Sequence, residues 1–266
     1  MFKLVSAVIA LGALVAPSAF AVPMSTHDYR FAGTLADAQG GPALTTIMGG
    51  TLGTAAAPGF RFGAGDGLQL AGGVSPGGPW SIELLFDYDS QGRYEKIIDF
   101  SGRASDSGLY TTYDVLSLYP VALAPVAQLT SGILADLVLT RSAAGTLTAY
   151  VNGTQSFSYD DSGSRIADLG ANPLTFFADD FVTDGREAAP GVVQRIRTYD
   201  TVLSYADVRA LVAGPSPRPV SLPEPWSLAV MAAGLLTLAA GRTVRLPGQS
   251  VRIASAFAGC AARTGA

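Results

Sequence analysis

The sequence predicts an all-β domain, a two-sheet antiparallel jelly-roll sandwich over residues 22–213. Within this range, short runs of alternating apolar and polar residues recur, which is the period of a half-buried strand. Glycine is abundant, with 31 in the 266-residue chain, and it gathers in the turns between those runs. Almost no long segment has the spacing of a helix. Many short strands with glycine-rich turns favour two packed sheets.

Eight strands are the clearest. They span Trp80–Tyr88, Tyr94–Phe100, Val115–Tyr119, Leu134–Arg141, Thr146–Val151, Thr154–Tyr159, Leu174–Phe177 and Val192–Tyr199. Asn152 and Gly153 separate two of these runs and favour the positive φ angles of a tight hairpin turn. With Thr154 they also spell an N-glycosylation sequon, which is the alternative interpretation. After the last strand, Ser204 predicts the N-cap of a short closing helix.

Residues 1–21 predict a secretory signal peptide. Lys3 precedes an apolar stretch, and the small residues Ala19 and Ala21 form an A-x-A cleavage site. An uncleaved membrane anchor is the alternative, but the stretch is short for a bilayer. We therefore expect cleavage after Ala21 and export of the domain across the inner membrane.

The C-terminal part of the chain differs in composition from the domain. Residues 214–222 are rich in proline and predict an extended linker. The motif Pro223, Glu224, Pro225 follows, then an apolar run over 228–240 and Arg242. Residues 223–245 thus resemble the PEP-CTERM sorting region. This resemblance implies a transmembrane helix in the inner membrane and an exosortase as the sorting partner, with an atypical tail over 246–266.

Charge and composition exclude several classes of function. Residues 22–214 carry 11 basic and 20 acidic side chains, a net charge of −9, which repels phosphate backbones and anionic lipids. Nucleic acid is therefore not an expected partner. The single cysteine, Cys260, lies outside the domain, so the domain has no disulfide. With one histidine, His27, a catalytic triad or a multi-histidine zinc site is hard to assemble.

The domain resembles laminin-G-like, concanavalin A-like jelly rolls in the order of its sequence phrases. These are residues 31–37 as opening strand and loop, 80–86 as a core strand, 137–153 as a hairpin, 177–180 with Glu187, and 195–204 as closing strand and helix. This fold carries both binding domains and enzymes, so the resemblance implies the architecture and leaves the activity to particular residues.

A polysaccharide hydrolase or lyase is the alternative function. Retaining glucanases of this fold place carboxylates as E-x-D-x-E on one strand face, and the chain has no such triplet. The nearest set is Glu83, Asp87 and Asp89, which we interpret as a solvated strand edge. His27 is expected to be an exposed terminal residue, and Trp80 a packing residue rather than a sugar platform.

One cofactor is predicted, a calcium ion held by Asp179, Asp180 and Glu187. These oxygen donors share one loop without histidine or cysteine, and hard oxygen ligands favour calcium. The alternative is a solvated loop with Asp179 and Asp180 on opposite faces. The sequence as a whole predicts an exported surface or extracellular-matrix protein that binds a carbohydrate or protein ligand without catalysis.

Overall fold

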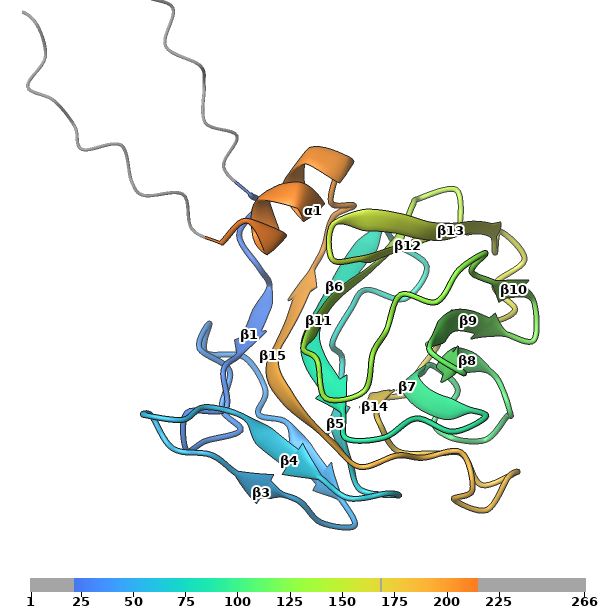
Figure 1. Ribbon diagram of the computed structural model, residues 1–266. Helices are drawn as coiled ribbons and strands as arrows, with labels where there is room; N and C mark the ends of the chain where they lie inside the picture. The colour runs from blue at the N-terminus through green and yellow to red at the C-terminus, as the bar shows by residue number, and fades with distance from the viewer. Residues whose placement is uncertain (1–21, 168, 215–266) are drawn as a thin grey trace, which may run out of the picture. The chain divides into compact units, whose positions relative to one another are not determined.

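A computed structural model describes residues 22–167 and 169–214, in which two antiparallel sheets pack face to face (Figure 1). The predicted all-β sandwich is therefore confirmed. The predicted signal peptide, the sorting region with its membrane helix, the tail, and all of the linker but Gly214 lie outside the described residues. Within the described ranges, no helix is long and apolar enough to span a membrane.

The chain crosses between the two sheets several times. In order they are β1 (His27–Tyr29), β2 (Thr45–Ile47), β3 (Thr51–Leu52), β4 (Phe60–Phe62), β5 (Gly67–Leu70), β6 (Trp80–Tyr88), β7 (Glu95–Asp99), β8 (Gly108–Thr112), β9 (Val115–Tyr119), β10 (Ala122–Leu123), β11 (Ala135–Arg141), β12 (Thr146–Val151), β13 (Thr154–Asp160), β14 (Leu174–Phe176) and β15 (Gly191–Tyr199). The eight-stranded sheet runs β13-β12-β11-β6-β15-β4-β3, with β1 also paired to β15. The seven-stranded sheet runs β10-β9-β8-β7-β14-β5-β2.

Strand β6 shows how the sequence pattern places the core. Side chains alternate across a strand. Ile82 and Leu84 therefore face the second sheet and are fully buried, while Ser81 and Glu83 face outward. Trp80 is buried at the start of β6 and stacks on Phe100 at 5.9 Å between ring centroids, which confirms its packing role.

The predicted hairpin and helix are both present. Asn152 has a φ of 50° and Gly153 a φ of 75°, so the turn between β12 and β13 takes the expected conformation. Helix α1 (Tyr205–Val212) begins after Ser204, whose side chain accepts from the Asp207 amide while Asp207 accepts in return. This reciprocal cap fixes where the helix starts.

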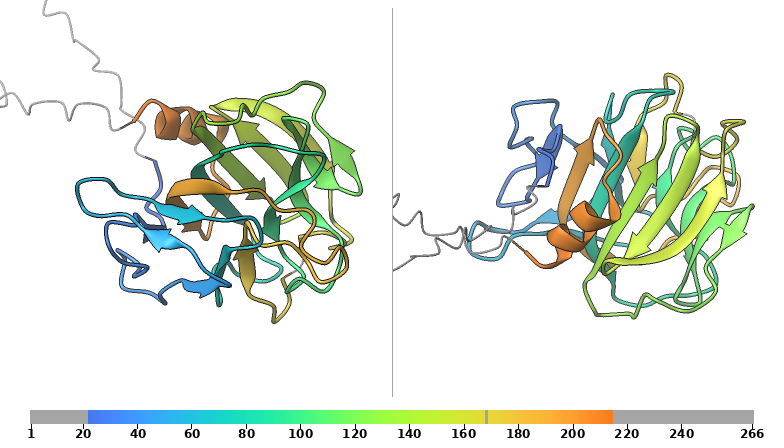
Figure 2. Two further views of the ribbon diagram at one scale, coloured as in Figure 1. Left: turned by 60° about the horizontal axis from the view of Figure 1, so that its bottom comes forward. Right: turned by 90° about the horizontal axis from the view of Figure 1, so that it is seen from above.

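Helix α1 covers part of the outer face of the eight-stranded sheet, as Figure 2 shows. A second apolar cluster forms there, apart from the main core, and comprises Val138, Tyr150, Tyr199, Leu203 and Val208. The closing helix therefore stabilises one outer face of the sandwich. No such helix covers the outer face of the other sheet among the described residues.

The eight predicted strands are all present, but the N-terminal region was predicted wrongly. The opening strand is β1, not residues 31–37, because Phe31 has a φ of 52° and turns the chain out of extended conformation. Strands β2 to β5, β8 and β10 are two to five residues long, and periodicity over so few residues gives little signal.

Replacing Gly153 with alanine should destabilise the domain by about 1 kcal/mol, because an L-residue is strained at this positive φ. An added Cβ would also approach Arg209 Cδ of helix α1 to 3.3 Å. Gly163→Ala is the control, since Gly163 lies in an exposed turn without positive φ. Urea unfolding measures both variants. Equal stability of the two would contradict the assigned turn.

Candidate functional site

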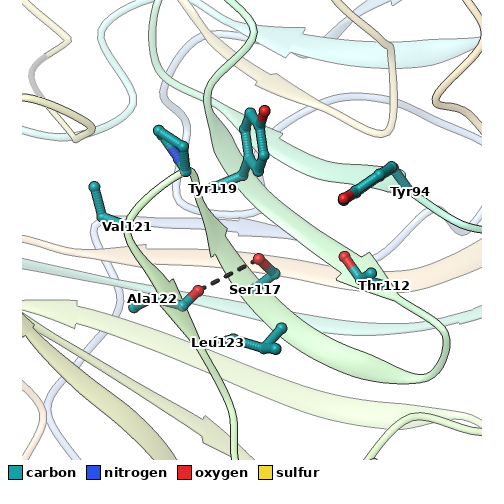
Figure 3. A pocket seen from close by; sticks show the side chains of 8 residues that line it. Tyr94, Thr112, Ser117, Tyr119, Val121, Ala122 and Leu123 are labelled. Atoms are coloured by element: carbon teal, nitrogen blue, oxygen red, sulfur yellow. Dashed lines mark hydrogen bonds between the residues drawn. The ribbon is translucent and has the colours of Figure 1, made fainter.

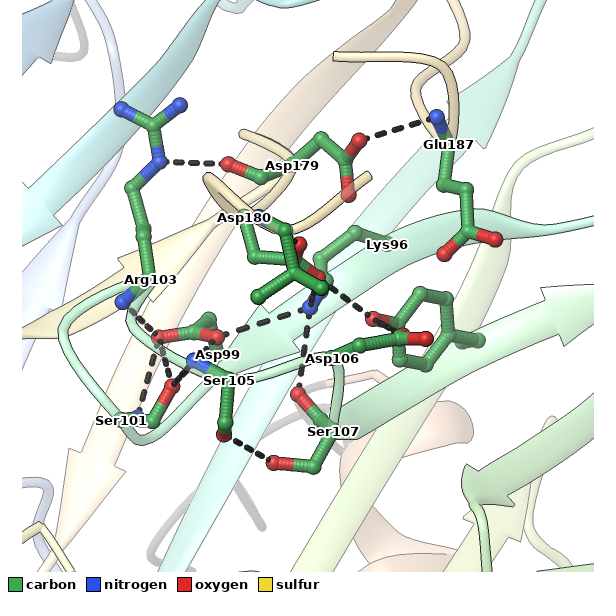
Figure 4. Close-up of polar contacts among 12 residues, drawn as sticks. Lys96, Asp99, Ser101, Arg103, Ser105, Asp106, Ser107, Asp179, Asp180 and Glu187 are labelled. Atoms are coloured by element: carbon green, nitrogen blue, oxygen red, sulfur yellow. Dashed lines mark hydrogen bonds and ion pairs between the residues drawn. The ribbon is translucent and has the colours of Figure 1, made fainter. Parts of the chain in front are cut away.

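A buried lysine organises the outer face of the seven-stranded sheet (Figure 4). Lys96, on β7, is fully buried, and its Nζ lies 2.7 Å from Asp180 Oδ2 and 3.5 Å from Asp99 Oδ2. It also donates to the Ser107 carbonyl at 3.1 Å and lies 4.4 Å from the centre of the Tyr110 ring. A buried ammonium is costly unless it is paired. These contacts therefore hold β7, β8 and the loop before β15 together.

Asp180 uses both carboxylate oxygens within the protein. Oδ2 accepts from Lys96 Nζ and from the Tyr110 hydroxyl, at 2.7 and 3.2 Å. Oδ1 accepts from the amides of Val182 and Thr183, at 2.8 and 2.9 Å. Burial opposes ionisation of Asp180, but the hydrogen bonds from Lys96 and the two amides outweigh it and lower the pKa. Asp180 is therefore ionised and fully partnered.

Asp179 is also buried, but only one of its oxygens is satisfied. Oδ2 accepts from the Thr183 hydroxyl at 2.7 Å and from the Glu187 amide at 3.0 Å. Oδ1 is buried and has no hydrogen-bond partner among the described residues. Arg103 donates to the carbonyl of Asp179, not to its carboxylate. An unpaired buried oxygen of this kind costs free energy unless a ligand or water meets it.

Glu187 completes an acidic cluster, which we define as Asp106, Asp179, Asp180 and Glu187. One oxygen each of Asp106, Asp180 and Glu187 lies within 4.8 Å of the others. Burial, followed by the charges of Asp106, Asp179 and Asp180, raises the pKa of Glu187 to about 7. Neither Asp106 nor Glu187 forms an ion pair within residues 22–167 and 169–214. The cluster therefore carries negative charge that the described chain does not neutralise.

The same seven-stranded sheet carries a groove lined by tyrosines, which Figure 3 shows. The tyrosine groove has a volume of about 270 Å³, and its wall includes Tyr94, Thr112, Ser117, Tyr119 and Leu123. The rings of Tyr94 and Tyr119 meet edge to face with centroids 5.8 Å apart. The Tyr119 ring also lies 5.8 Å from the Tyr110 ring, whose hydroxyl donates to Asp106 at 3.2 Å, so the groove adjoins the acidic cluster.

A second cavity, of about 420 Å³, adjoins the groove because Tyr94 lines both. This acidic cavity is lined by Gly92, Arg93, Tyr94, Glu95, Thr183, Arg186 and Glu187. An aromatic groove and a carboxylate-lined cavity therefore share one wall. Together they offer ring faces, hydroxyl groups and acceptor oxygens, which is the chemistry of a binding site for a polar ligand.

Residues 62–209, more than half of the chain, match the family described as the concanavalin A-like lectin/glucanases superfamily. The chain belongs to this superfamily. No curated protein matches it. The superfamily has the predicted fold and includes both carbohydrate-binding modules and glycoside hydrolases.

Solved structures agree on the fold. Domain 4 of the extracellular GH43 arabinanase AbnA from Geobacillus stearothermophilus, in complex with arabinotriose, is 17% identical, with a TM-score of 0.55 over 71% of this chain and 98% of that one. Trypanosoma rangeli sialidase in complex with 2,3-difluorosialic acid is 13% identical, with a TM-score of 0.56 over 72% of this chain. The binding domain of botulinum neurotoxin serotype D is 13% identical, with a TM-score of 0.53 over 72% of this chain. The chain spans 33% of the sialidase and 52% of the toxin domain, so these likenesses concern the fold alone.

The structure brings together two of the three residues predicted to hold calcium. Oxygens of Asp180 and Glu187 lie within 4.8 Å of each other and of an Asp106 oxygen, and the sequence analysis missed Asp106 because it is distant in the chain. The alternative interpretation, a solvated loop, is wrong, because Asp179 and Asp180 are both buried. Lys96 already supplies a cation to Asp180, and it would repel a calcium ion bound there. A calcium ion at Asp179, Asp180 and Glu187 stays a prediction.

The carboxylates that come nearest to a hydrolytic set in the sequence lie on the other sheet, and the position of Glu83 corrects our interpretation of a solvated strand edge. Glu83 is not on a solvated edge but fully buried on the central strand β6, where Arg195 and Tyr199 donate to its carboxylate. Asp87 lies four residues away on the same face, about 13 Å along an extended strand, and Asp89 pairs with Arg61 at 2.7 Å. These separations and ion pairs do not assemble a retaining carboxylate pair.

His27 was also predicted wrongly, because it is buried rather than exposed. It lies on β1, and its Nδ1 is 2.7 Å from Asp37 Oδ2. Asp37 in turn accepts from the amides of Asp28, Gln39 and Gly41. This contact fixes the loop after β1. His27 therefore has a structural role at the start of the domain, away from the acidic cluster on the other sheet.

Lys96→Met should destabilise the domain by about 3 to 5 kcal/mol, because it leaves the buried carboxylates of Asp180 and Asp99 without their cation. Arg61→Met is the matched control, since its pair with Asp89 is exposed and should contribute less than about 1 kcal/mol. Urea unfolding at neutral pH compares the two. A Lys96 variant as stable as the control would show that this ion pair does not organise the site.

Proposed function

We propose that this chain is an exported envelope or extracellular-matrix protein whose sandwich binds glycans without catalysis. The observation that carries the proposal is the pair of half-buried tyrosines, Tyr94 and Tyr119, which line one groove beside the acidic cluster. Tyrosine offers a large apolar face together with a polar hydroxyl, so it suits the apolar ring faces and hydroxyl groups of a sugar. A glycan-bound neighbour of the same fold, the arabinanase domain with arabinotriose, supports this class of ligand.

The titrating groups near the groove favour binding over lyase chemistry. A tyrosine that acts as a base needs a lowered pKa. Burial and neighbouring carboxylates, above all Asp180, instead raise the pKa of Tyr110, and Asp106 raises that of Tyr119. His27 is bound to Asp37 and cannot act as the base in place of these tyrosines. No phenolate or imidazole base is therefore expected at this site.

A polysaccharide hydrolase is the second candidate function. One observation favours it: Asp106 and Glu187 have oxygens within 4.8 Å, and the pKa of Glu187 is raised to about 7. A protonated carboxyl beside an ionised one is the arrangement of a retaining glycosidase. The buried Asp180, fully partnered by Lys96 and backbone amides, is closed to a role as nucleophile. The hydrolase hypothesis therefore depends on Asp106 and Glu187 alone.

Alanine substitution of Tyr94 or Tyr119 should weaken glycan binding by about tenfold each, which corresponds to about 1.4 kcal/mol of lost stacking. Tyr113→Ala is the control, because Tyr113 is exposed and lines neither cavity. A glycan array with the purified protein, followed by titration of the strongest ligand, measures the effect. Unchanged affinity in both groove variants would contradict the site. Release of reducing sugar that Glu187→Gln abolishes would favour the hydrolase instead.

Export and sorting complete the proposal. The signal peptide over residues 1–21 directs the chain outward, and the sorting region with Pro223, Glu224 and Pro225 would be recognised by an exosortase. The apolar run over 228–240 is short for a bilayer, so Trp226 and Arg242 would lie at its two interfaces. The sandwich would then face outward.

Deleting residues 227–245 should convert the protein from an envelope-bound to a freely secreted form, because it removes the predicted membrane helix. Mass spectrometry of the wild-type protein from cells should find no peptide that contains Cys260, since processing near Pro223 removes the tail. A mature protein that retains Cys260 would refute the processing step.

A further inference from the structure

The acidic cavity contains carboxylate oxygens that the described chain leaves unpaired. Glu95 is 93% buried; its Oε1 accepts from the Gly92 amide at 2.6 Å, while its Oε2 has no hydrogen-bond partner. Asp179 Oδ1 is likewise buried without a hydrogen-bond partner. After burial, the Asp179 charge raises the pKa of Glu95, and it also contributes to the raised pKa of Glu187. Glu95 and Glu187 line this cavity, and Asp179 is buried beside it, where its Oδ2 accepts from the Glu187 amide at 3.0 Å.

The nearby basic groups do not neutralise these acids. Lys96 pairs with Asp180 and Asp99. Arg186 is exposed and donates through Nε to the Thr183 carbonyl at 2.7 Å, and the exposed Arg93 lies 5.3 Å from the centre of the Tyr94 ring. No ion pair joins any of these groups to Glu95, Asp179 or Glu187 in the described part of the chain. Water screens the exposed arginines more than the buried carboxylates.

The Tyr94 ring adds a second preference for a cation. An aromatic face attracts positive charge, and Tyr94 lines the cavity beside the carboxylates. An ammonium group donates three hydrogen bonds, which matches unpaired acceptor oxygens. Calcium needs six to eight oxygen ligands, and the Lys96 ammonium would repel a divalent ion more strongly than a singly charged one.

We propose that the acidic cavity binds the protonated amine of an amino sugar, so that the glycan ligand is one with free amino groups, such as a glucosamine oligomer. This inference rests on the proposed glycan binding and names the class of glycan. The sugar ring packs on Tyr94, and the ammonium donates to Glu95 and Glu187. The carboxylates of Glu95 and Glu187 then discriminate against uronic and sialic acids, whose own carboxylates they repel.

The experiment compares two oligosaccharides that differ only in N-acetylation. Isothermal titration calorimetry of the full-length chain, at pH 7 and after chelation of divalent ions, measures the affinity for a glucosamine hexamer and for an N-acetylglucosamine hexamer. The amine form should bind at least about tenfold more tightly, which is the factor expected for about 1.4 kcal/mol of charge interaction. Glu187→Gln should remove most of this difference, because it preserves the shape and deletes the negative charge that a bound ammonium favours on Glu187.

Control variants separate the possible failures. Asp200→Asn deletes one exposed carboxylate at the end of β15 and should leave the preference unchanged. Tyr94→Ala should weaken both hexamers. Equal binding of the two hexamers, still sensitive to Tyr94→Ala, would overturn the amine inference while glycan binding stands. Binding of neither hexamer, with another glycan bound, would also overturn it. Calcium that binds the wild type tightly and excludes the amine would assign the cavity to a metal instead.

Discussion

The outer face of the seven-stranded sheet depends on the ion pairs that the Lys96 ammonium forms with buried carboxylates. This ammonium lies between two buried carboxylates, those of Asp180 and Asp99, and above the Tyr110 ring. Because a buried charge is stable only when it is compensated, the lysine and the aspartates require one another. The loop after β14 is consequently held against β7 and β8. That position is what brings Glu187 near Asp106, although 81 positions separate them in the chain.

The two outer faces of the sandwich differ in whether their carboxylates have cationic partners. On the eight-stranded sheet, the carboxylate of Glu83 is met by Arg195, Arg197 and Tyr199, and helix α1 packs nearby. Burial and the Glu83 charge raise the pKa of the neighbouring Asp136 to about 7, so Asp136 carries only part of its negative charge near neutral pH. On the seven-stranded sheet, Glu187 and Asp106 have no such cationic partners among the described residues. The second face therefore keeps carboxylates that no cation of the described residues pairs with.

Local patterns predicted a large part of the fold. Long strands such as β6 and β11, the turn at Asn152 and Gly153, and the cap at Ser204 follow from periodicity, φ preference and hydrogen bonding within a few residues. The candidate site was predicted only in part. Asp180 and Glu187 were found because they share one acidic loop, but nothing in the sequence linked them to Lys96 or Asp106. Glu83 and His27 were taken as exposed because polar side chains usually are, whereas here each has a buried partner.

The sequence by itself determined the fold class, the alternation that places the core, and the net negative charge of the domain, because each depends on neighbouring residues or on composition. Only the tertiary structure decided which charges are compensated. The pairing of β7 with β8 and β14 places Lys96 beside Asp180, and it leaves Glu95 and Glu187 on the wall of one cavity, with Asp179 buried beside them. Such a balance depends on distances between residues remote in the chain, which strand register sets and local sequence does not encode.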